Sequence, residues 1–158
     1  MINISELHSS EIVLGLITTV GTDTDNVIRY ISEHLKKFSY TTEVINVSSE
    51  ILKSFDKESP TFDSEYDRIT YYMDLGNTVR NETTDAAIVM KGVAAHILSN
   101  RDSVDDPSPK QNIAYIVKSI KHPEEASFLK QVYGDGFHLI GITSDISDRL
   151  KFLTDVKS

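Results

Sequence analysis

The chain has 158 residues, of which 39% are hydrophobic and 25% charged, the composition of a folded globular domain rather than a disordered chain. It contains no cysteine, which excludes disulfides, thiolate zinc sites and a cysteine nucleophile. The net charge of −8 argues against a broad nucleic-acid surface, and no apolar stretch approaches the roughly 20 residues that span a bilayer. We therefore expect a cytoplasmic protein that binds neither membrane nor nucleic acid.

Residues 11–17 form an apolar, β-branched run that predicts a strand buried on both faces. A short polar stretch follows, and apolar residues then recur at helical spacing from Val27 to Leu35. Backbone N–H groups at such a strand-to-helix turn converge on an anion, and the helix dipole favours negative charge there. We expect a nucleotide phosphate to bind against Thr18, Thr19, Gly21, Thr22, Asp23 and Thr24.

The turn departs from the phosphate-binding pattern G-x-x-x-x-G-K-[ST]. Thr18 and Asp23 stand at the glycines, Thr24 at the lysine, and Asp25 at the hydroxyl that binds magnesium. The two carboxylates repel phosphate unless magnesium intervenes, so magnesium with nucleotide is the one cofactor we consider. The alternative is a polar turn in which Thr22 or Asp23 only caps the helix.

The remaining elements alternate between helices and strands. The apolar runs predict further strands over residues 42–47, 112–118 and 137–143. Helical patterns cover residues 50–55, 64–80, 85–100, 123–133 and 145–153, and residues 101–111 are the most linker-like stretch. Strands separated by helices predict an α/β domain with a parallel sheet and right-handed crossovers, over residues 11–158 after an N-terminal extension of residues 1–10.

Three separated motifs carry a family resemblance. They are Gly15-Leu-Ile-Thr-Thr-Val-Gly-Thr-Asp, Gly76-Asn-Thr-Val-Arg and Ser119-Ile-Lys-His-Pro-Glu-Glu, the last continuing through Tyr133-Gly into the final strand. Over about residues 11–150 the chain resembles the N-terminal P-loop, nucleotide-kinase-like domain of the two-domain deoxycytidylate deaminases that defend bacteria against phage. The resemblance implies a three-layer P-loop fold, here without the lid and the last strand of the kinases.

The resemblance also implies a role. In that family a zinc-dependent deaminase domain follows, but its Pro-Cys-x-x-Cys signature is absent from this chain, so we expect neither zinc nor deamination. A regulatory domain that binds a nucleotide or deoxynucleotide fits best, with a deaminase domain or a second copy of the chain as partner. We expect the strand at residues 137–143 to lie at one side of the sheet with an exposed edge, which invites association.

Other candidate residues lie outside the turn. Arg80 ends a helix where nucleotide kinases place a cation for the acceptor phosphate, and Arg149 follows the last strand at the edge where open α/β sheets bind ligands. His122 either touches a phosphate or caps a helix whose N-terminal amides Glu124 would bind. Each arginine has the alternative of an ordinary exposed side chain. The five histidines have no metal-ligand spacing.

Two rival functions remain open. An active nucleoside or nucleotide kinase needs positioned cations, which the missing lysine argues against. A non-binding interaction module of the same fold is the second rival. Tyr71, Tyr72 and Met73 either meet a base or belong to the core or an interface. A Gly21→Val change is expected to abolish phosphate binding and leave the fold largely intact.

Overall fold

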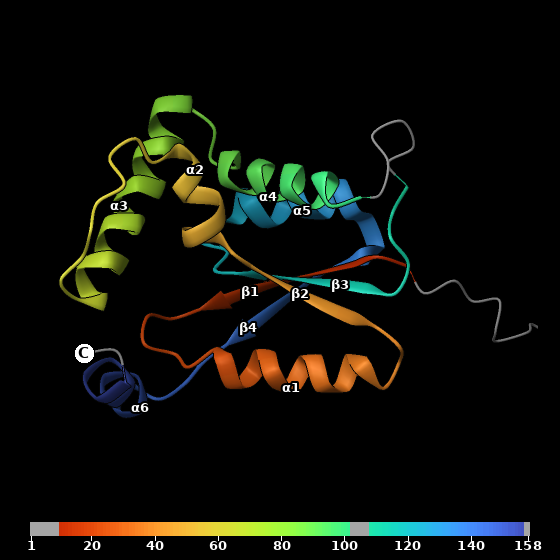
Figure 1. The fold of residues 1–158 in the computed structure, drawn as a ribbon, viewed down its shortest axis with the longest axis horizontal. Coiled ribbons are helices and arrows are strands. Elements are labelled where there is room, and N and C mark those ends of the chain that lie inside the picture. The colour runs from red at the N-terminus through yellow and green to blue at the C-terminus, as the bar shows by residue number, and fades with distance from the viewer. Residues whose placement is uncertain (1–9, 102–107, 157–158) are drawn as a thin grey trace, which may run out of the picture.

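The computed structural model describes residues 10–101 and 108–156, and a four-stranded parallel sheet lies at its centre (Figure 1). The strands are β1 (Ile12–Thr18), β2 (Thr41–Asn46), β3 (Ile113–Lys118) and β4 (Phe137–Ile142). Each strand begins and ends within one residue of its predicted bounds. The α/β class and the parallel sheet are therefore confirmed.

The strand order is β2-β3-β1-β4, so β1 and β3 are neighbours at the centre of the sheet. Leu14 of β1 lies opposite Ile116 of β3 and His138 of β4. The crossover from β1 passes through α1 (Asp25–Lys36) on one face, and the crossover from β3 passes through α5 (Pro123–Tyr133) on the other (Figure 1). Neighbouring strands whose crossovers leave toward opposite faces open a crevice at their carboxyl ends.

Helices cover both faces, which is compatible with a three-layer α/β fold. Ile28 of α1 packs with Leu14, Leu16 and Ile116 on one face. On the other face, α5, α4 (Ile88–Ser99) and η2 (Val47–Leu52) enclose a larger core, to which β3 contributes two residues. These are Tyr115 and Val117, whereas Ile116 between them belongs to the α1 side, as the period of two along a strand requires.

The remaining elements are α2 (Lys53–Phe55), α3 (Glu65–Thr83), η3 (Gly134–Gly136), α6 (Ile146–Lys151) and η4 (Phe152–Val156). Ser64 caps α3 by accepting a hydrogen bond from the Asp67 N–H at 3.1 Å. The helix predicted from residue 85 begins only at Ile88, because Asp85 accepts the Ala87 N–H at 2.9 Å and forms a turn first. Of the predicted linker, residues 102–107 lie outside the described ranges, as do residues 1–9 of the predicted extension.

β4 lies at one side of the sheet, as predicted, and within the described residues β1 is its only partner strand. His138 and Leu139 in β4 are exposed. β4 therefore offers an unpaired edge in this part of the chain. No helix in the described ranges combines the length and apolarity needed to cross a bilayer.

Candidate functional site

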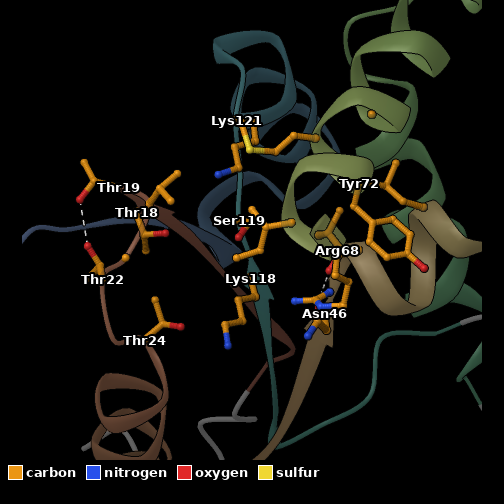
Figure 2. A pocket seen from close by; sticks show the side chains of 18 of the residues that line it. Thr18, Thr19, Thr22, Thr24, Asn46, Arg68, Tyr72, Lys118, Ser119 and Lys121 are labelled. Atoms are coloured by element: carbon orange, nitrogen blue, oxygen red, sulfur yellow. Dashed lines mark hydrogen bonds between the residues drawn. The ribbon is translucent and has the colours of Figure 1, made fainter. Parts of the chain in front are cut away.

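A cavity of about 400 Å³ lies at the carboxyl ends of β1, β2 and β3. This volume falls in the range of about 300–1,000 Å³ that is common for small-molecule sites. Figure 2 shows three groups of side chains around it: the threonines after β1, the polar residues at the end of β3, and residues of α3 with Asn46 of β2. The crevice that the topology opens between β1 and β3 is therefore part of a real cavity.

The turn after β1 is compact because its hydroxyl groups bond one another. Thr22 donates its N–H to the Thr19 carbonyl at 3.1 Å, and the two hydroxyl oxygens lie 2.9 Å apart. The Thr22 hydroxyl also accepts from Ser144, beyond β4, at 3.2 Å. Gly21 has a φ of +83°, a left-handed conformation that favours glycine. The turn is thus held in one shape and tied to the segment that follows β4.

The start of α1 separates Asp23 from the cavity. The Asp23 carboxylate accepts the Asp25 N–H at 3.0 Å and the Asn26 side-chain amide at 2.8 Å, and it is not part of the cavity wall. Thr24 is the N-cap residue but makes no side-chain capping bond, and it is buried in the wall. Capping of the helix by Asp23, the alternative interpretation, accounts for that residue.

The end of β3 brings positive charge to the cavity. Lys118 follows Val117 and therefore lies on the α1 side of the sheet, where its Nζ is 2.7 Å from Oδ1 of Asp25. Ser119 comes next with a φ of +80°, which is strained for a residue with a Cβ. Lys121 also lines the cavity, and within the described residues its ammonium has no ion-pair partner. Backbone strain of this kind is concentrated at functional sites.

Arg80 lines the cavity, but its guanidinium is already engaged. Its Nε and Nη2 donate to Oε1 of Glu125 at 3.1 and 2.5 Å, and the other oxygen of Glu125 accepts the N–H groups of Lys121 and His122. The Glu125 side chain is fully buried. The expectation that Glu124 binds these amides was wrong: Glu124 is exposed, and the third helical residue is the one that reaches back to the cap.

Residues of α3 form the apolar side of the wall. Tyr72 and Met73 line the cavity, and the Arg68 guanidinium lies 6.0 Å from the centre of the Tyr72 ring. Tyr71 is not part of the wall; its hydroxyl donates to Oδ1 of Asp56 at 2.8 Å. This hydrogen bond, with burial, raises the pKa of Tyr71 to about 12. Of the three residues that were candidates to meet a base, Tyr72 and Met73 line the cavity and Tyr71 does not.

Most of the predicted site residues meet at the cavity. The lining includes Thr18, Thr19, Gly21, Thr22, Thr24, Arg80 and His122. Arg149 is not in the lining: its Nη1 donates to the Val20 carbonyl at 3.3 Å, so it supports the turn.

A Cβ on Gly21 would lie 2.8 Å from the Arg149 carbonyl oxygen. A side chain at position 21 would therefore press on α6 as well as on the turn, and the effect of Gly21→Val on phosphate binding and on the fold stays a prediction. Whether any of the predicted site residues binds a nucleotide also stays a prediction.

The sequence analysis missed Lys118, Lys121 and Arg68. The signal for Lys118 was present, because a lysine at the last position of a buried strand falls at the ligand-binding edge of a parallel sheet. Arg68 had no local signal, since the path of α3 brings it to the cavity. Across the described ranges, no cluster of three or more His, Asp or Glu side chains is arranged to hold a metal ion.

The chain matches no known family model, and a search of curated proteins finds no significant similarity.

Proposed function

We propose that this chain is a nucleotide-binding regulatory domain with a P-loop, nucleotide-kinase-like fold, of the kind that precedes the deaminase domain in phage-defence deoxycytidylate deaminases. The cavity at the carboxyl ends of β1 and β3 is the observation that carries the proposal. Open α/β sheets bind nucleotides at this position, where neighbouring crossovers leave toward opposite faces. The family assignment comes from the motif resemblance, and the binding proposal comes from the cavity.

The charge of the wall supports an anionic ligand. In a chain with a net charge of −8, the wall gathers Arg68, Arg80, Lys118 and Lys121. The N-terminus of α1 adds partial positive charge on the opposite side of the same space. A phosphate between the turn after β1 and the end of β3 would lie close to the lysines of the wall and to the N-terminus of α1. Asp25 and Glu65 also line the cavity and pair with Lys118 and Arg68, so the ligand phosphate must compete with these carboxylates.

The shape of the wall supports a base at the other end. Ile69, Tyr72 and Met73 of α3 give the cavity an apolar and aromatic lining. Figure 2 shows Tyr72 on the side of the cavity away from the threonines of the turn. Ligand sites commonly combine such a surface with a few polar groups that fix orientation. In this arrangement the phosphate lies near α1 and the base lies against α3.

The same residues favour sensing over turnover. Phosphoryl transfer depends on cations that reach the transferred group. Thr24 stands where the phosphate-binding lysine is expected, and the buried carboxylate of Glu125 holds the guanidinium of Arg80. Binding without reaction is the activity that this wall fits best.

A binding panel tests the proposal. Calorimetry and thermal shift with ribonucleotides and deoxynucleotides, as mono- and triphosphates and with or without magnesium, should reveal selective binding. A ligand at a hundred times its Kd stabilises the native state by about 2.7 kcal/mol. Lys121→Met should weaken binding about tenfold, because it removes a cation from the wall.

Lys36→Met is the matched control, since Lys36 is an exposed lysine in the last turn of α1, far from the carboxyl edge. It should leave the affinity unchanged. A wild-type chain that binds no nucleotide would contradict the proposal and favour the interaction module. Equal losses in the two variants would mean that the cavity is not the binding site.

A further inference from the structure

Three of the basic side chains in the cavity wall have carboxylate partners within the protein. Arg68 pairs with Glu65 at 2.6 Å, and Lys118 pairs with Asp25 at 2.7 Å. The third pair is Arg80 with Glu125. A phosphate that enters the cavity can recruit one of these cations only if the carboxylate can be released.

The burial of the carboxylates decides which pair can open. The Glu125 side chain is fully buried, so release of Arg80 would leave a buried charge without its partner, which is strongly unfavourable. Glu65 holds Arg68 through two hydrogen bonds, to Nε and Nη2, from the preceding turn of the same helix. The Asp25 side chain is 68% exposed, and water can solvate it once it is released. Lys118 is therefore the paired cation that is easiest to transfer to a ligand.

The position of Lys118 matches what the turn lacks. Asp25 is the first residue of α1, at the helix N-terminus where an anion is favoured, and Thr24 before it stands at the lysine of the phosphate-binding pattern. Lys118 reaches this place from β3, because its side chain lies on the α1 side of the sheet. Figure 2 shows Lys118 across from Thr24 and Thr18. An ammonium group is thus present beside the turn, although the turn has no lysine.

We propose that Lys118 is a phosphate-binding cation of the cavity, beside Lys121, and that a ligand phosphate displaces Asp25 from it. This inference rests on the proposed nucleotide binding and deepens it. The ammonium of Lys118 supplies the charge that magnesium supplies in other nucleotide sites, so binding is independent of magnesium. Asp25 acts as a competitor for the cation rather than as a metal ligand.

The two members of the pair give opposite predictions. The probe is inorganic tripolyphosphate, which has the phosphates of a nucleoside triphosphate without the base, titrated by calorimetry in the presence of EDTA. Lys118→Met should weaken its binding about tenfold to a hundredfold, and Lys118→Arg should retain most of it. Asp25→Asn should strengthen binding about two- to fivefold, because it removes the competing carboxylate.

Matched controls come from the partly exposed pair of Lys91 and Asp85, which lies outside the cavity wall. Lys91→Met and Asp85→Asn change the net charge in the same two directions, and each should alter the affinity by less than about twofold. Thermal melts of all variants establish that they are folded.

Each contrary outcome has a distinct meaning. If Lys118→Met binds tripolyphosphate as the wild type does, or if nucleotides bind and tripolyphosphate does not, this inference fails while the proposed function stands. If binding requires magnesium and Asp25→Asn abolishes it, Asp25 is a metal ligand and the inference is wrong. A wild type that binds neither probe overturns both proposals.

Discussion

Arg80 and Glu125 are 45 positions apart in the sequence and form a buried ion pair in which Nε and Nη2 of the arginine donate to one carboxylate oxygen. The pair joins α3 to the start of α5. Because the second oxygen of Glu125 accepts the N–H groups of Lys121 and His122, one carboxylate fixes two sides of the cavity wall. The wall is therefore built before any ligand arrives.

Arg80→Met should lower the free energy of unfolding by about 3–5 kcal/mol, because it leaves the buried Glu125 carboxylate without its charged partner. Arg68→Met is the control, since the Arg68 and Glu65 side chains are 33% and 24% exposed and its loss should cost about 1 kcal/mol or less. Urea denaturation measures both. Equal losses of unfolding free energy in Arg80→Met and Arg68→Met would show that the buried ion pair stabilises the fold no more than the partly exposed one.

Gly21→Ala should destabilise the chain by about 1–3 kcal/mol, because alanine is strained at a positive φ and its Cβ would press on the Arg149 carbonyl. Gly141→Ala is the matched control. Its Cβ would meet nothing within 4 Å, and the φ of Gly141 is not positive. Urea midpoints compare the two variants. A Gly21→Ala chain as stable as Gly141→Ala would mean that the turn adapts freely.

The free energy of unfolding should fall at alkaline pH, and the ionisation of Tyr71 should cause part of this fall. The hydrogen bond to Asp56, together with burial, raises its pKa from 10.0 to about 12. A raised pKa in the folded state stabilises the fold below pH 10, and this contribution is lost as the pH rises through about 12. Tyr71→Phe should therefore reduce the loss of stability between pH 10 and 12, as measured by urea denaturation at several pH values.

Tyr133 should also contribute to the loss of stability at alkaline pH, so Tyr71→Phe should remove only part of that loss. Burial, reinforced by the negative charge of Glu11, raises the pKa of Tyr133 to about 12 as well. Absorbance titration of phenolate should show one fewer late-titrating tyrosine in Tyr71→Phe than in the wild type. An unchanged late phase would contradict the assignment to Tyr71.

We expect no ATP-dependent kinase activity toward nucleosides or nucleotides. Thr24 replaces the lysine of the phosphate-binding pattern, and Glu125 already engages Arg80, the candidate cation for an acceptor phosphate. A coupled assay with each common nucleoside and nucleoside monophosphate as acceptor measures turnover. Activity that copurifies with the chain and disappears in Lys121→Met would show that the domain is a catalyst.

We expect the isolated chain to self-associate through β4, because an unpaired strand edge is a template for further pairing. Leu139 of β4 is 46% exposed, and Leu139→Lys should shift the equilibrium toward monomer. Leu98→Lys, on the exposed surface of α4, is the control and should leave the equilibrium between monomer and oligomer unchanged. Light scattering over a range of concentrations follows the change. A wild type that is monomeric at every concentration would rule this association out.

β1, β3 and β4 were predictable because each is a mainly apolar run bounded by polar residues, and the bounds of all four strands differ from the prediction by at most one residue. The ion pairs were not predictable in this way. Lys118 and Asp25 are 93 positions apart, and only the pairing of β1 with β3 brings them together. A local sequence pattern predicts which residues lie at the carboxyl ends of the strands, but it does not predict which of these residues contact one another.

The candidate site shows the same limit at single residues. Asp23 and Thr24 are adjacent in the turn, yet Thr24 lies in the cavity wall and Asp23 binds the start of α1. Arg149 likewise contacts the outside of the turn through the Val20 carbonyl. The direction of each side chain depends on the backbone angles of one turn, which residue type alone does not fix. Glu125 stands three residues after His122, which is the spacing at which a capping box places its acidic residue.

The pairing of Ile12 with Ala114 has a consequence for how the cavity comes into being. Contacts between residues so far apart in sequence close a long loop, and topologies rich in such contacts fold slowly. The threonine turn and α1 are local and can form early, whereas the lysines at the end of β3 join them only when the central strands have paired. The cavity is therefore a late product of folding, because its two sides belong to segments that meet only when β1 and β3 pair.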